Sequence, residues 1–378
     1  MNSTNLSVSI IGGGPAGCAT ALALQKHARR KGFELNIFVF TAPNTNAPCI
    51  GETVPPVLNQ HLRDIDAHEI LEGDDHLICP GSISEWQESR AGYNDFLFTP
   101  VGNGYHLNRE LFNQQLLATC KKQLIEVVDN ARLTDIEPHE NGYRLALKRN
   151  GQRNTHYSDF VVDATGHNRS FTSKLNIAVN HFDKVMSICA IYALPEGEKR
   201  AANTMVSSAP SGWWYGTQLP ENKALISFCT DSFELKSQDL SAPRNWYRTL
   251  LDSTWFYQQC IHQLGCELPE PDSLHLRPSP SDILSNVVGR NWLAVGDAAS
   301  SYDSISSAGI TKSVIHGNLA GEAICKSICK QDEKPLLDYQ DSVFNDFSQY
   351  IKQHQMHYHA GGSRFNYSGF WKRRLVNA

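Results

Sequence analysis

The first forty residues alternate between a short apolar run, an alanine- and leucine-rich stretch and a second apolar run. The run at 8–11 predicts a buried strand, and residues 16–31 have the spacing of a helix that packs one face against that strand. Residues 34–40 predict a second strand. Together they form a βαβ unit, from which doubly wound parallel sheets are built.

The remaining chain continues this pattern around a β-rich interruption at 185–230. We expect helices over about 57–71, 108–123, 243–264, 307–330 and 336–357, strands over 125–129, 131–137, 142–148, 160–163 and 291–297, and a β-hairpin within 82–99. This order predicts a nucleotide-binding domain made of separated segments. The expected boundaries are 1–78, 104–182 and 275–330 for the nucleotide domain, 79–103 and 183–274 for a β-rich substrate domain, and 331–378 for a C-terminal helical tail.

The turn between the first strand and the first helix carries glycines in the pattern G-x-G-x-x-G. Gly12 allows a tight turn, Gly14 lets a pyrophosphate approach the backbone, and Gly17 lets the helix pack closely on the strand. Pro15 and Ala16 begin the helix, whose first N–H groups and partial positive charge favour phosphate. The context predicts a dinucleotide site.

The second strand departs from the usual pattern of such sites. An acidic residue normally ends this strand and holds the adenosine ribose hydroxyls, but here Phe40 is followed by Thr41. We expect Thr41 or a backbone group to replace the carboxylate. A cofactor held without that carboxylate should be retained less tightly than in most such folds.

Composition adds few constraints. The 378 residues are 41% hydrophobic and 19% charged, with a formal net charge of -5, which favours neither nucleic acid nor an anionic membrane as a partner. No apolar run is long enough to span a bilayer, and the first strand leaves no room for a signal peptide. We therefore expect a cytoplasmic protein whose ten scattered cysteines are free thiols.

Two further motifs follow expected strands: Asp163-Ala164-Thr165-Gly166 and Gly296-Asp297-Ala298-Ala299-Ser300. A small-residue segment, Ser306-Ser307-Ala308-Gly309-Ile310, then begins an expected helix. With the glycine turn and Arg109, this order resembles the FAD-dependent aromatic monooxygenases and flavin-dependent halogenases over nearly the whole chain. The resemblance implies FAD as cofactor and an α/β fold. It implies a Rossmann-like FAD-binding domain of the aromatic hydroxylase type, an inserted β-sheet substrate domain and C-terminal helices.

The resemblance also assigns cofactor contacts. Asp297 would bind the ribitol chain, and Arg109 would approach the phosphate and ribose region unless it is a solvated first-turn side chain. The N–H groups of Ala308, Gly309 and Ile310 would face the flavin pyrimidine edge, where a helix N-terminus stabilises negative charge. The expected set is completed by Asp163, Thr165 and Gly166.

Two segments resemble the halogenase branch. The segment at 51–56 is similar to the "G-E-x-x-x-P" stretch that runs beside the flavin, and Trp213 and Trp214 are similar to the tunnel tryptophans. The two tryptophans are adjacent here, however, and residues 78–82 lack the lysine that receives hypohalous acid. Halogenation itself is therefore disfavoured.

The full motif set resembles a smaller group, the maturation flavoproteins that help to build tryptophylquinone cofactors (cysteine tryptophylquinone) in partner amine or amino-acid oxidases. The resemblance implies oxygenation of a peptidyl tryptophan in an oxidase precursor through a flavin C4a-hydroperoxide. Only one glycine fingerprint is present, and Asp163 is followed by Ala164 where the family's D-G motif, which is linked to NADPH use, would have glycine. The resemblance therefore implies an external flavin reductase or free reduced flavin as the electron source. The alternatives are a small-molecule aromatic monooxygenase or halogenase relative, and a flavin-binding chaperone without turnover.

Several candidate side chains have both a functional and a structural interpretation. Glu52 is a base near the flavin or a loop anchor, Trp213 and Trp214 line a tunnel or fill the core, and Cys79 is an inert thiol rather than a reactive one. The histidines at 354, 357 and 359 do not by themselves predict a metal site. The aromatic and basic residues at 370–374 are a candidate docking segment for a partner protein.

Overall fold

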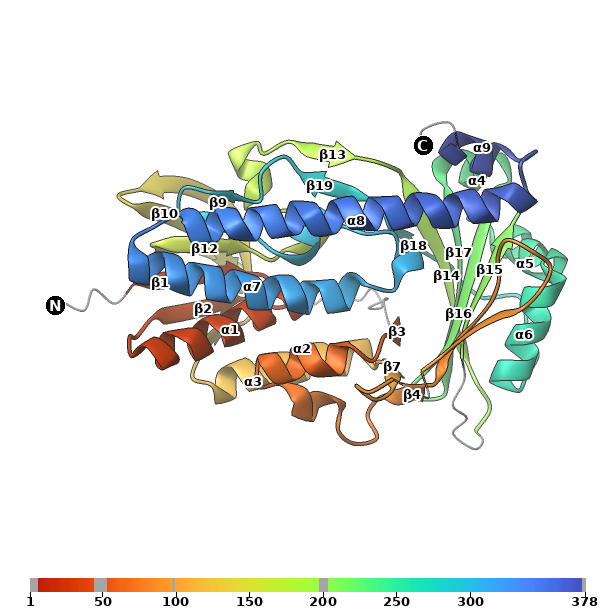
Figure 1. The fold of residues 1–378 in the computed structure, drawn as a ribbon, viewed down its shortest axis with the longest axis horizontal. Helices are drawn as coiled ribbons and strands as arrows, with labels where there is room; N and C mark the ends of the chain where they lie inside the picture. Colours follow the sequence, from red (N-terminus) through yellow and green to blue (C-terminus); the bar gives the residue numbers. More distant parts are fainter. Residues whose placement is uncertain (1–5, 44–52, 97–98, 197–202, 376–378) are drawn as a thin grey trace.

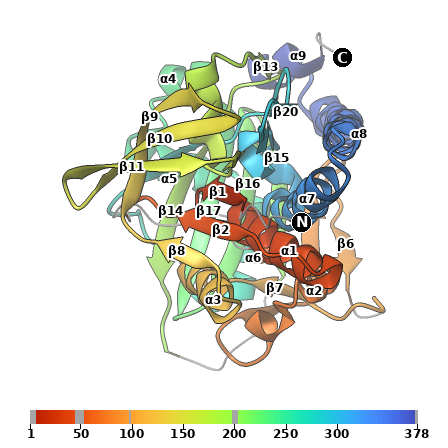
Figure 2. The same ribbon diagram turned by 90° about the vertical axis from the view of Figure 1, so that its left-hand side faces the viewer.

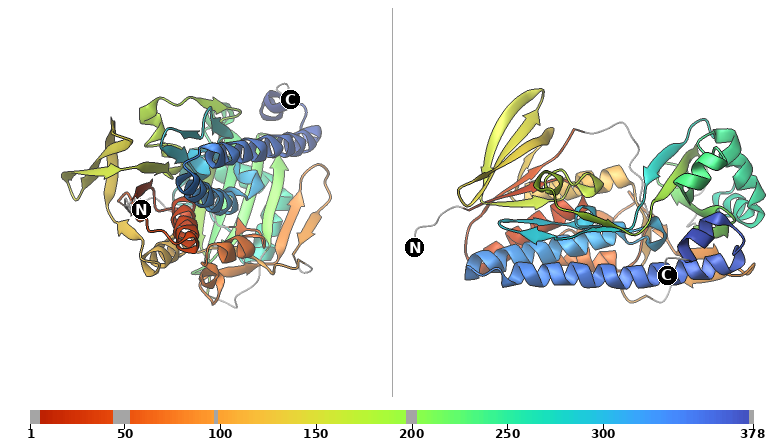
Figure 3. Two further views of the ribbon diagram at one scale, coloured as in Figure 1. Left: turned by 60° about the vertical axis from the view of Figure 1, so that its left-hand side comes forward. Right: turned by 90° about the horizontal axis from the view of Figure 1, so that it is seen from above.

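The two largest β-sheets lie toward opposite ends of the molecule (Figure 1). The computed structural model describes residues 6–43, 53–96, 99–196 and 203–375. Helix α8, Lys334–Arg364, runs along the molecule from one sheet to the other, as the view from above in Figure 3 also shows. At about 1.5 Å per residue this helix is long enough to join the two halves.

The first sheet has six strands in the order β20-β21-β12-β1-β2-β8. Their bounds are Ser7–Ile11 (β1), Asn36–Phe40 (β2), Glu126–Val128 (β8), Phe160–Asp163 (β12), Val288–Gly289 (β20) and Trp292–Ala294 (β21). Every neighbouring pair is parallel except β20 with β21. This confirms the predicted α/β sheet and places the carboxyl ends of β1, β2, β12 and β21 along one edge.

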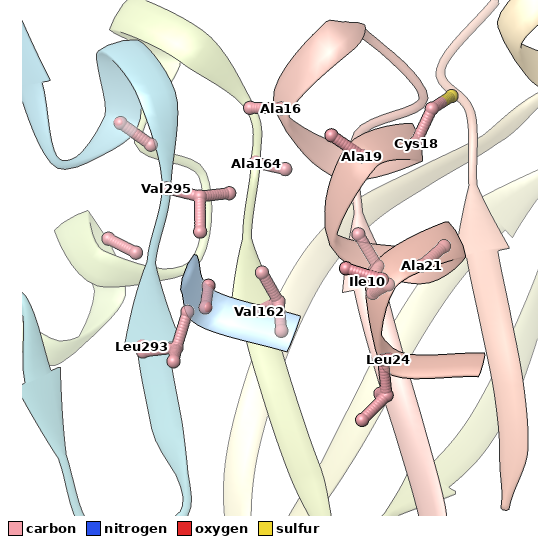
Figure 4. Packing of buried hydrophobic residues seen from close by; sticks show 14 of the residues in the cluster. Ile10, Ala16, Cys18, Ala19, Ala21, Leu24, Val162, Ala164, Leu293 and Val295 are labelled. Carbon is pink, nitrogen blue, oxygen red and sulfur yellow. The ribbon is translucent and has the colours of Figure 1, made fainter. Parts of the chain in front are cut away.

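Helices α1 (Pro15–Lys31) and α7 (Gly309–Lys330) pack against one another beside this sheet. The contact is close because a Cβ at Gly317 would lie 2.7 Å from the carbonyl oxygen of Ala16, and one at Gly321 would lie 2.6 Å from the backbone nitrogen of Leu24. Small side chains of α1 share a buried cluster with Ile10 and Val162 of the strands (Figure 4). The close packing brings the two helix N-termini to the same edge of the sheet.

An antiparallel meander covers the opposite side of the sheet (Figure 2). It consists of β9 (Ala131–His139), β10 (Gly142–Arg149) and β11 (Gln152–Ser158). Leu145 and Leu147 of β10 belong to the same hydrophobic core as the six-stranded sheet. The alternation in 152–158 is mostly polar, so the sequence did not predict β11.

The second sheet has seven strands in the order β18-β14-β17-β16-β15-β5-β6, antiparallel except for β5 with β15. Their bounds are Gly81–Glu85 (β5), Gly92–Asp95 (β6), Val185–Ala193 (β14), Thr204–Ala209 (β15), Gly212–Leu219 (β16), Lys223–Asp231 (β17) and His275–Pro278 (β18). The hairpin predicted within 82–99 is thus β5–β6. Strand β18 pairs with β14, so residues 275–278 join this sheet rather than the nucleotide-binding segment to which they were assigned. The remaining domain boundaries stay a prediction.

Helices α5 (Pro243–Asp252) and α6 (Thr254–Leu264) contribute to the hydrophobic cluster on one face of the seven-stranded sheet. The sequence predicted one helix here, but the chain breaks at Ser253, which lies between them with φ -86° and ψ 62°. The other face meets the end of α8 and helix α9, Gly369–Leu375. Helix α4, Ser232–Ser237, follows β17.

Short elements join the two sheets. Strands β3 (Thr53–Val54), β7 (Gly104–His106) and β4 (Leu77–Cys79) form one small sheet, and β13 (Val179–His181), β19 (Asp282–Leu284) and β22 (Ser300–Ser301) form another. Helices α2 (Leu58–Asp64) and α3 (Arg109–Lys122) complete the fold. The Asn108 side chain accepts a hydrogen bond from the Leu111 N–H and so forms the N-cap of α3. In the part of the chain that the structure describes, none of the helices is long and apolar enough to cross a membrane.

Candidate functional site

The three glycine- and aspartate-containing motifs converge at the carboxyl edge of the six-stranded sheet. The Gly12 N–H donates to the Phe40 carbonyl (2.9 Å), and the Val295 N–H donates to the Asp163 carbonyl (3.0 Å). The Ala164 N–H donates to the Ile11 carbonyl (2.8 Å). Parallel sheets bind nucleotides at this edge, outside the carboxyl ends of their strands.

The glycines of the first turn have the distinct roles that their spacing predicts. Gly12 has φ +114°, and a Cβ there would lie 2.2 Å from the Ala164 carbonyl oxygen. A Cβ at Gly17 would lie 1.9 Å from the Gly12 carbonyl oxygen, so both glycines are required for packing. A Cβ at Gly14 would meet nothing within 4 Å. Gly14 therefore faces open space, where a ligand can approach the backbone.

Two helices begin at this edge without a side-chain cap. Gly14 is the N-cap of α1, with Pro15 as the first helical residue, and Ala308 is the N-cap of α7. A Cβ at Gly309 would meet nothing within 4 Å, as at Gly14. The first N–H groups of both helices and their positive dipole ends can therefore serve a bound anion. Ile310, in the first turn of α7, is buried in the core beneath.

The sheet edge also carries a charged cluster around Asp297, just after Gly296. The Lys312 Nζ lies 2.8 Å from Asp297 Oδ1, and the His167 Nε2 lies 3.7 Å from Oδ2. Desolvation alone would raise the pKa of Asp297, but Lys312, His167 and Arg109 together hold that pKa below its ordinary value. The carboxylate is one-third exposed, so it can accept hydrogen bonds from a ligand while ionised.

Lys312 is a member of this cluster that the sequence reasoning missed. Its side chain is 5% exposed and lies 4.3 Å from the centre of the Tyr302 ring, and its Nζ also donates to the Ser300 carbonyl. The available signal was a lysine two residues after the small-residue segment that begins the helix. Its charge compensates that of Asp297, as the desolvation of a carboxylate requires.

The Asp163 carboxylate holds the loop that follows β12 in place through hydrogen bonds. This buried carboxylate accepts hydrogen bonds from the N–H groups of Thr165, Phe171 and Thr172. The Thr165 hydroxyl donates to the same carboxylate at 2.7 Å. Gly166 has φ +60° and open space where its Cβ would be. Asp163 thus shapes the turn at Gly166, while direct cofactor contacts of these residues stay a prediction.

The carboxylate of Asp129, which follows strand β8, lies beside the end of β2. Because β2 pairs in parallel with β8, Thr41 and Asp129 both follow strand ends at the same edge. The Thr41 hydroxyl donates to Asp129 Oδ1 at 3.1 Å, and the Lys121 Nζ lies 3.2 Å from Oδ2. Thr41 also touches the glycine turn, since a Cβ at Gly13 would lie 2.5 Å from its methyl group. A half-exposed carboxylate therefore lies next to the place where the sequence lacked one.

A buried polar network connects this edge with the seven-stranded sheet. The Thr53 Oγ1 lies 2.6 Å from the Tyr215 hydroxyl and 3.0 Å from His106 Nδ1. The Thr217 Oγ1 lies 2.8 Å from the same nitrogen. His106 is fully buried and lies three residues before Arg109, which follows the N-cap of α3. One segment thus contributes to both the network and the charged cluster.

Cys79 lies beside this network, with its Sγ 3.7 Å from the Thr204 Oγ1. Burial raises the pKa of the Cys79 thiol above its ordinary value. A protonated, buried thiol is a weak nucleophile, in agreement with the inert role predicted.

Of the three residues predicted to be catalytic, the structure describes two, Trp213 and Trp214. Trp213 and Trp214 are fully buried on opposite faces of the seven-stranded sheet. The Trp213 Nε1 donates to the Tyr358 hydroxyl at 3.0 Å, and that of Trp214 donates to the Ser253 hydroxyl at 2.8 Å. Both contacts fit a packing role, and a catalytic role stays a prediction. Glu52 lies outside the described residues.

The predicted docking role of the C-terminal aromatics is wrong for the aromatic pair. Phe370 and Trp371 are fully buried, and the Trp371 Nε1 donates to the Ala209 carbonyl at 2.9 Å. Arg373 and Arg374 form ion pairs with Asp231 at 2.9 Å and 3.0 Å. These residues fasten α9 to the seven-stranded sheet instead.

Comparison with known proteins identifies an FAD-binding domain in this chain. Residues 9–168 match the FAD-NAD(P)-binding family model. LodB of Marinomonas mediterranea, assigned as an FAD-dependent oxidoreductase, is 24% identical over 371 residues, 97% of this chain and 95% of LodB.

Solved structures resemble the whole fold. The flavin-dependent halogenase CmlS superposes with a TM-score of 0.82 at 20% identity, covering 98% of this chain and 68% of CmlS. QhpG, a peptidyl tryptophan dihydroxylase essential for tryptophylquinone cofactor biogenesis, superposes with a TM-score of 0.75 at 20% identity. That match covers 97% of this chain and 78% of QhpG. The chain therefore has the fold shared by flavin-dependent halogenases and monooxygenases.

Proposed function

Since the chain is an FAD-dependent oxidoreductase with the fold of the flavin-dependent halogenases and monooxygenases, we propose that it oxygenates a tryptophan residue of a partner protein. The partner would be an amine or amino-acid oxidase precursor, and the modified residue would become part of its tryptophylquinone cofactor. An external flavin reductase would supply the electrons.

The observation that carries the proposal is the resemblance along nearly the whole chain to a peptidyl tryptophan dihydroxylase. It agrees with the absence of a lysine in residues 78–82, where the halogenase branch has one. The site is also compatible, because its polar network lies between the cofactor edge and the sheet that carries Tyr215.

The residues at the sheet edge fit FAD. The open space at Gly14 and Gly309 and the two uncapped helix ends provide room and N–H donors for the pyrophosphate and the flavin. Asp297, kept ionised by its neighbours, would accept hydrogen bonds from the ribitol hydroxyls. The Asp129 carboxylate beside Thr41 would hold the adenosine ribose. Bound there, reduced FAD would supply the activation of molecular oxygen for transfer to an electron-rich ring.

The chain's own chemical task is then to orient the indole and take up its proton. Adding an OH group to a ring carbon leaves the hydrogen already on that carbon to be lost as a proton, which restores the aromatic ring. The Tyr215 hydroxyl, Thr53 Oγ1 and His106 Nδ1 form a hydrogen-bonded chain that can carry that proton inward, with His106 as the final acceptor. Tyr215 is partly exposed, whereas His106 is fully buried, so the chain leads from the accessible side into the protein.

A small aromatic molecule is the second candidate substrate, favoured by the structural match to halogenases such as CmlS. A flavin-binding chaperone without turnover is the third candidate. It would bind the partner but leave its mass unchanged.

The deciding experiment is intact-mass analysis of a candidate oxidase precursor co-expressed with and without this protein. We expect a gain of one or two oxygen atoms, or the loss of hydrogens that accompanies quinone formation, only when this chain is present. Modification of small aromatic compounds with an unchanged precursor mass would favour the second candidate. An unchanged mass in a stable complex would favour the chaperone.

A Tyr215→Phe variant tests the proton route in the same assay. We expect about a hundredfold slower modification, the scale of general acid–base catalysis, with unchanged FAD content. Tyr157→Phe is the matched control because Tyr157 is exposed on β11, outside the site. Equal rates in both variants would contradict the proposed route.

A further inference from the structure

Two buried carboxylates meet under helix α8, away from the charged cluster at Asp297. Asp183 lies between β13 and β14, and Asp303 follows β22. Each has one oxygen fixed by the chain: Asp183 Oδ1 accepts from the N–H groups of Val185 (3.2 Å) and Ser281 (3.0 Å). Asp303 Oδ1 accepts from the Ile305 N–H at 3.2 Å.

The second oxygen of each carboxylate points to the same histidine of α8. The His354 Nε2 lies 3.2 Å from Asp303 Oδ2 and 3.5 Å from Asp183 Oδ2. All three atoms lie within 4.8 Å of one another. A first-row divalent ion at about 2.0–2.2 Å from nitrogen and oxygen ligands needs ligand atoms separated by such distances.

The charges in this cluster are unbalanced without a further cation or proton. The Asp183 side chain is 9% exposed, yet its Oδ2 accepts no hydrogen bond. A buried carboxylate oxygen without a donor is costly, so the geometry leaves a place for a positive ligand.

We propose that Asp183, Asp303 and His354 form a binding site for one divalent transition-metal ion, of which Zn²⁺ fits the mixed nitrogen and oxygen donors best. The surroundings supply the second layer that such sites need. The Tyr358 hydroxyl donates to Asp303 Oδ2 at 2.5 Å, and the Tyr350 hydroxyl lies 2.6 Å from the Ser281 hydroxyl. Arg374, the nearby cation, is already paired with Asp231.

The ion would cross-link three segments of the chain that are far apart in sequence. Asp183 belongs to the crossover into the seven-stranded sheet, Asp303 to the loop after the Asp297 motif, and His354 to the helix that joins both halves. Its role would be structural, and the proposal is independent of the substrate. Metal content and thermal stability therefore test it without an activity assay.

The test uses the full chain, freed of metal with a chelator and titrated with Zn²⁺ by calorimetry. We expect one equivalent bound, and a melting temperature raised by about 3–6 °C at a hundredfold excess over Kd. Co²⁺ as a second probe should give visible bands of nitrogen and oxygen ligation without thiolate charge-transfer bands. Thiolate bands would assign the binding to cysteines and overturn the proposal.

Asp183→Asn removes the charge but can still accept the two backbone hydrogen bonds, so it separates metal binding from folding. We expect this variant to lose the bound equivalent and the thermal response. His357→Ala, an exposed histidine of the same helix, is the control and should bind metal normally. If the wild type binds no ion and Asp183→Asn melts at a higher temperature, a shared proton or the His354 charge balances the carboxylates, and the proposal is wrong.

Discussion

At the residue scale, the cofactor edge combines side chains that the sequence identifies with others that only pairing of the strands brings there. Gly12, Gly14 and Gly17 could be assigned in advance, because their roles follow from local backbone geometry. Asp129 could not, because its position beside Thr41 depends on β8 being the parallel neighbour of β2. Lys312 was missed for a similar reason, since its partner Asp297 lies fifteen residues away across a turn.

The Asp129 carboxylate gives a prediction about cofactor selectivity. Asp129→Asn should weaken FAD binding about tenfold, the loss expected for one charge-assisted hydrogen bond that is partly exposed. FMN lacks the adenosine, so its affinity should not change. Fluorescence titration of the two flavins measures both effects.

Lys121→Met is the matched control because it breaks the same Lys121–Asp129 ion pair but leaves the carboxylate in place. It should keep FAD affinity within about twofold, as exposed ion pairs contribute little. Equal FAD affinity in wild type and Asp129→Asn would mean that the ribose is held elsewhere. It would also restore the expectation of weak retention drawn from Thr41.

At the scale of elements, sequence periodicity located most helices but not their packing. The prediction of a helix over 307–330 is confirmed by α7, yet its contact with α1 depends on Gly317 and Gly321, which line one face of the helix. The split of α5 from α6 was missed because a one-residue break leaves the apolar pattern almost unchanged. Strand β11 was missed because it is a polar edge strand, which shows little apolar alternation.

Gly317→Ala tests whether this contact positions the two helix N-termini. Alanine normally favours a helix interior over glycine, but here its Cβ would lie 2.6 Å from the Ala19 Cβ and 2.8 Å from the Thr20 nitrogen. We expect a loss of about 1–3 kcal/mol in the free energy of unfolding, together with weaker FAD binding. Gly309→Ala, which meets nothing within 4 Å, should leave the stability of the flavin-free protein unchanged. Denaturant titration compares the two, and a stabilised Gly317→Ala would show that α1 and α7 can separate at little cost.

At the scale of the whole molecule, α8 and α9 hold the two sheets together. The Tyr339 hydroxyl of α8 donates to the Ala294 carbonyl at the end of β21 (2.7 Å). Further along the helix, the Tyr358 hydroxyl accepts from Trp213 of the seven-stranded sheet. Helix α9 then returns against that sheet, where the Arg374 guanidinium lies 3.7 Å from the centre of the Phe370 ring. Sequence alone gave no sign of this arrangement, because an aromatic and basic segment is equally typical of an exposed docking site.

Trp371→Ala distinguishes the structural role of α9 from a docking role. Trp371 is fully buried and contacts the Trp86 ring at a centroid distance of 5.9 Å. Its truncation should therefore lower the free energy of unfolding by about 3–5 kcal/mol. Lys372→Ala, which alters only an exposed side chain, should change stability by less than about 0.5 kcal/mol. Below its melting temperature, Trp371→Ala should still bind FAD and modify the partner, because the cofactor edge lies in the other half of the molecule. A variant that keeps its stability but no longer modifies the partner would instead make α9 part of the recognition surface.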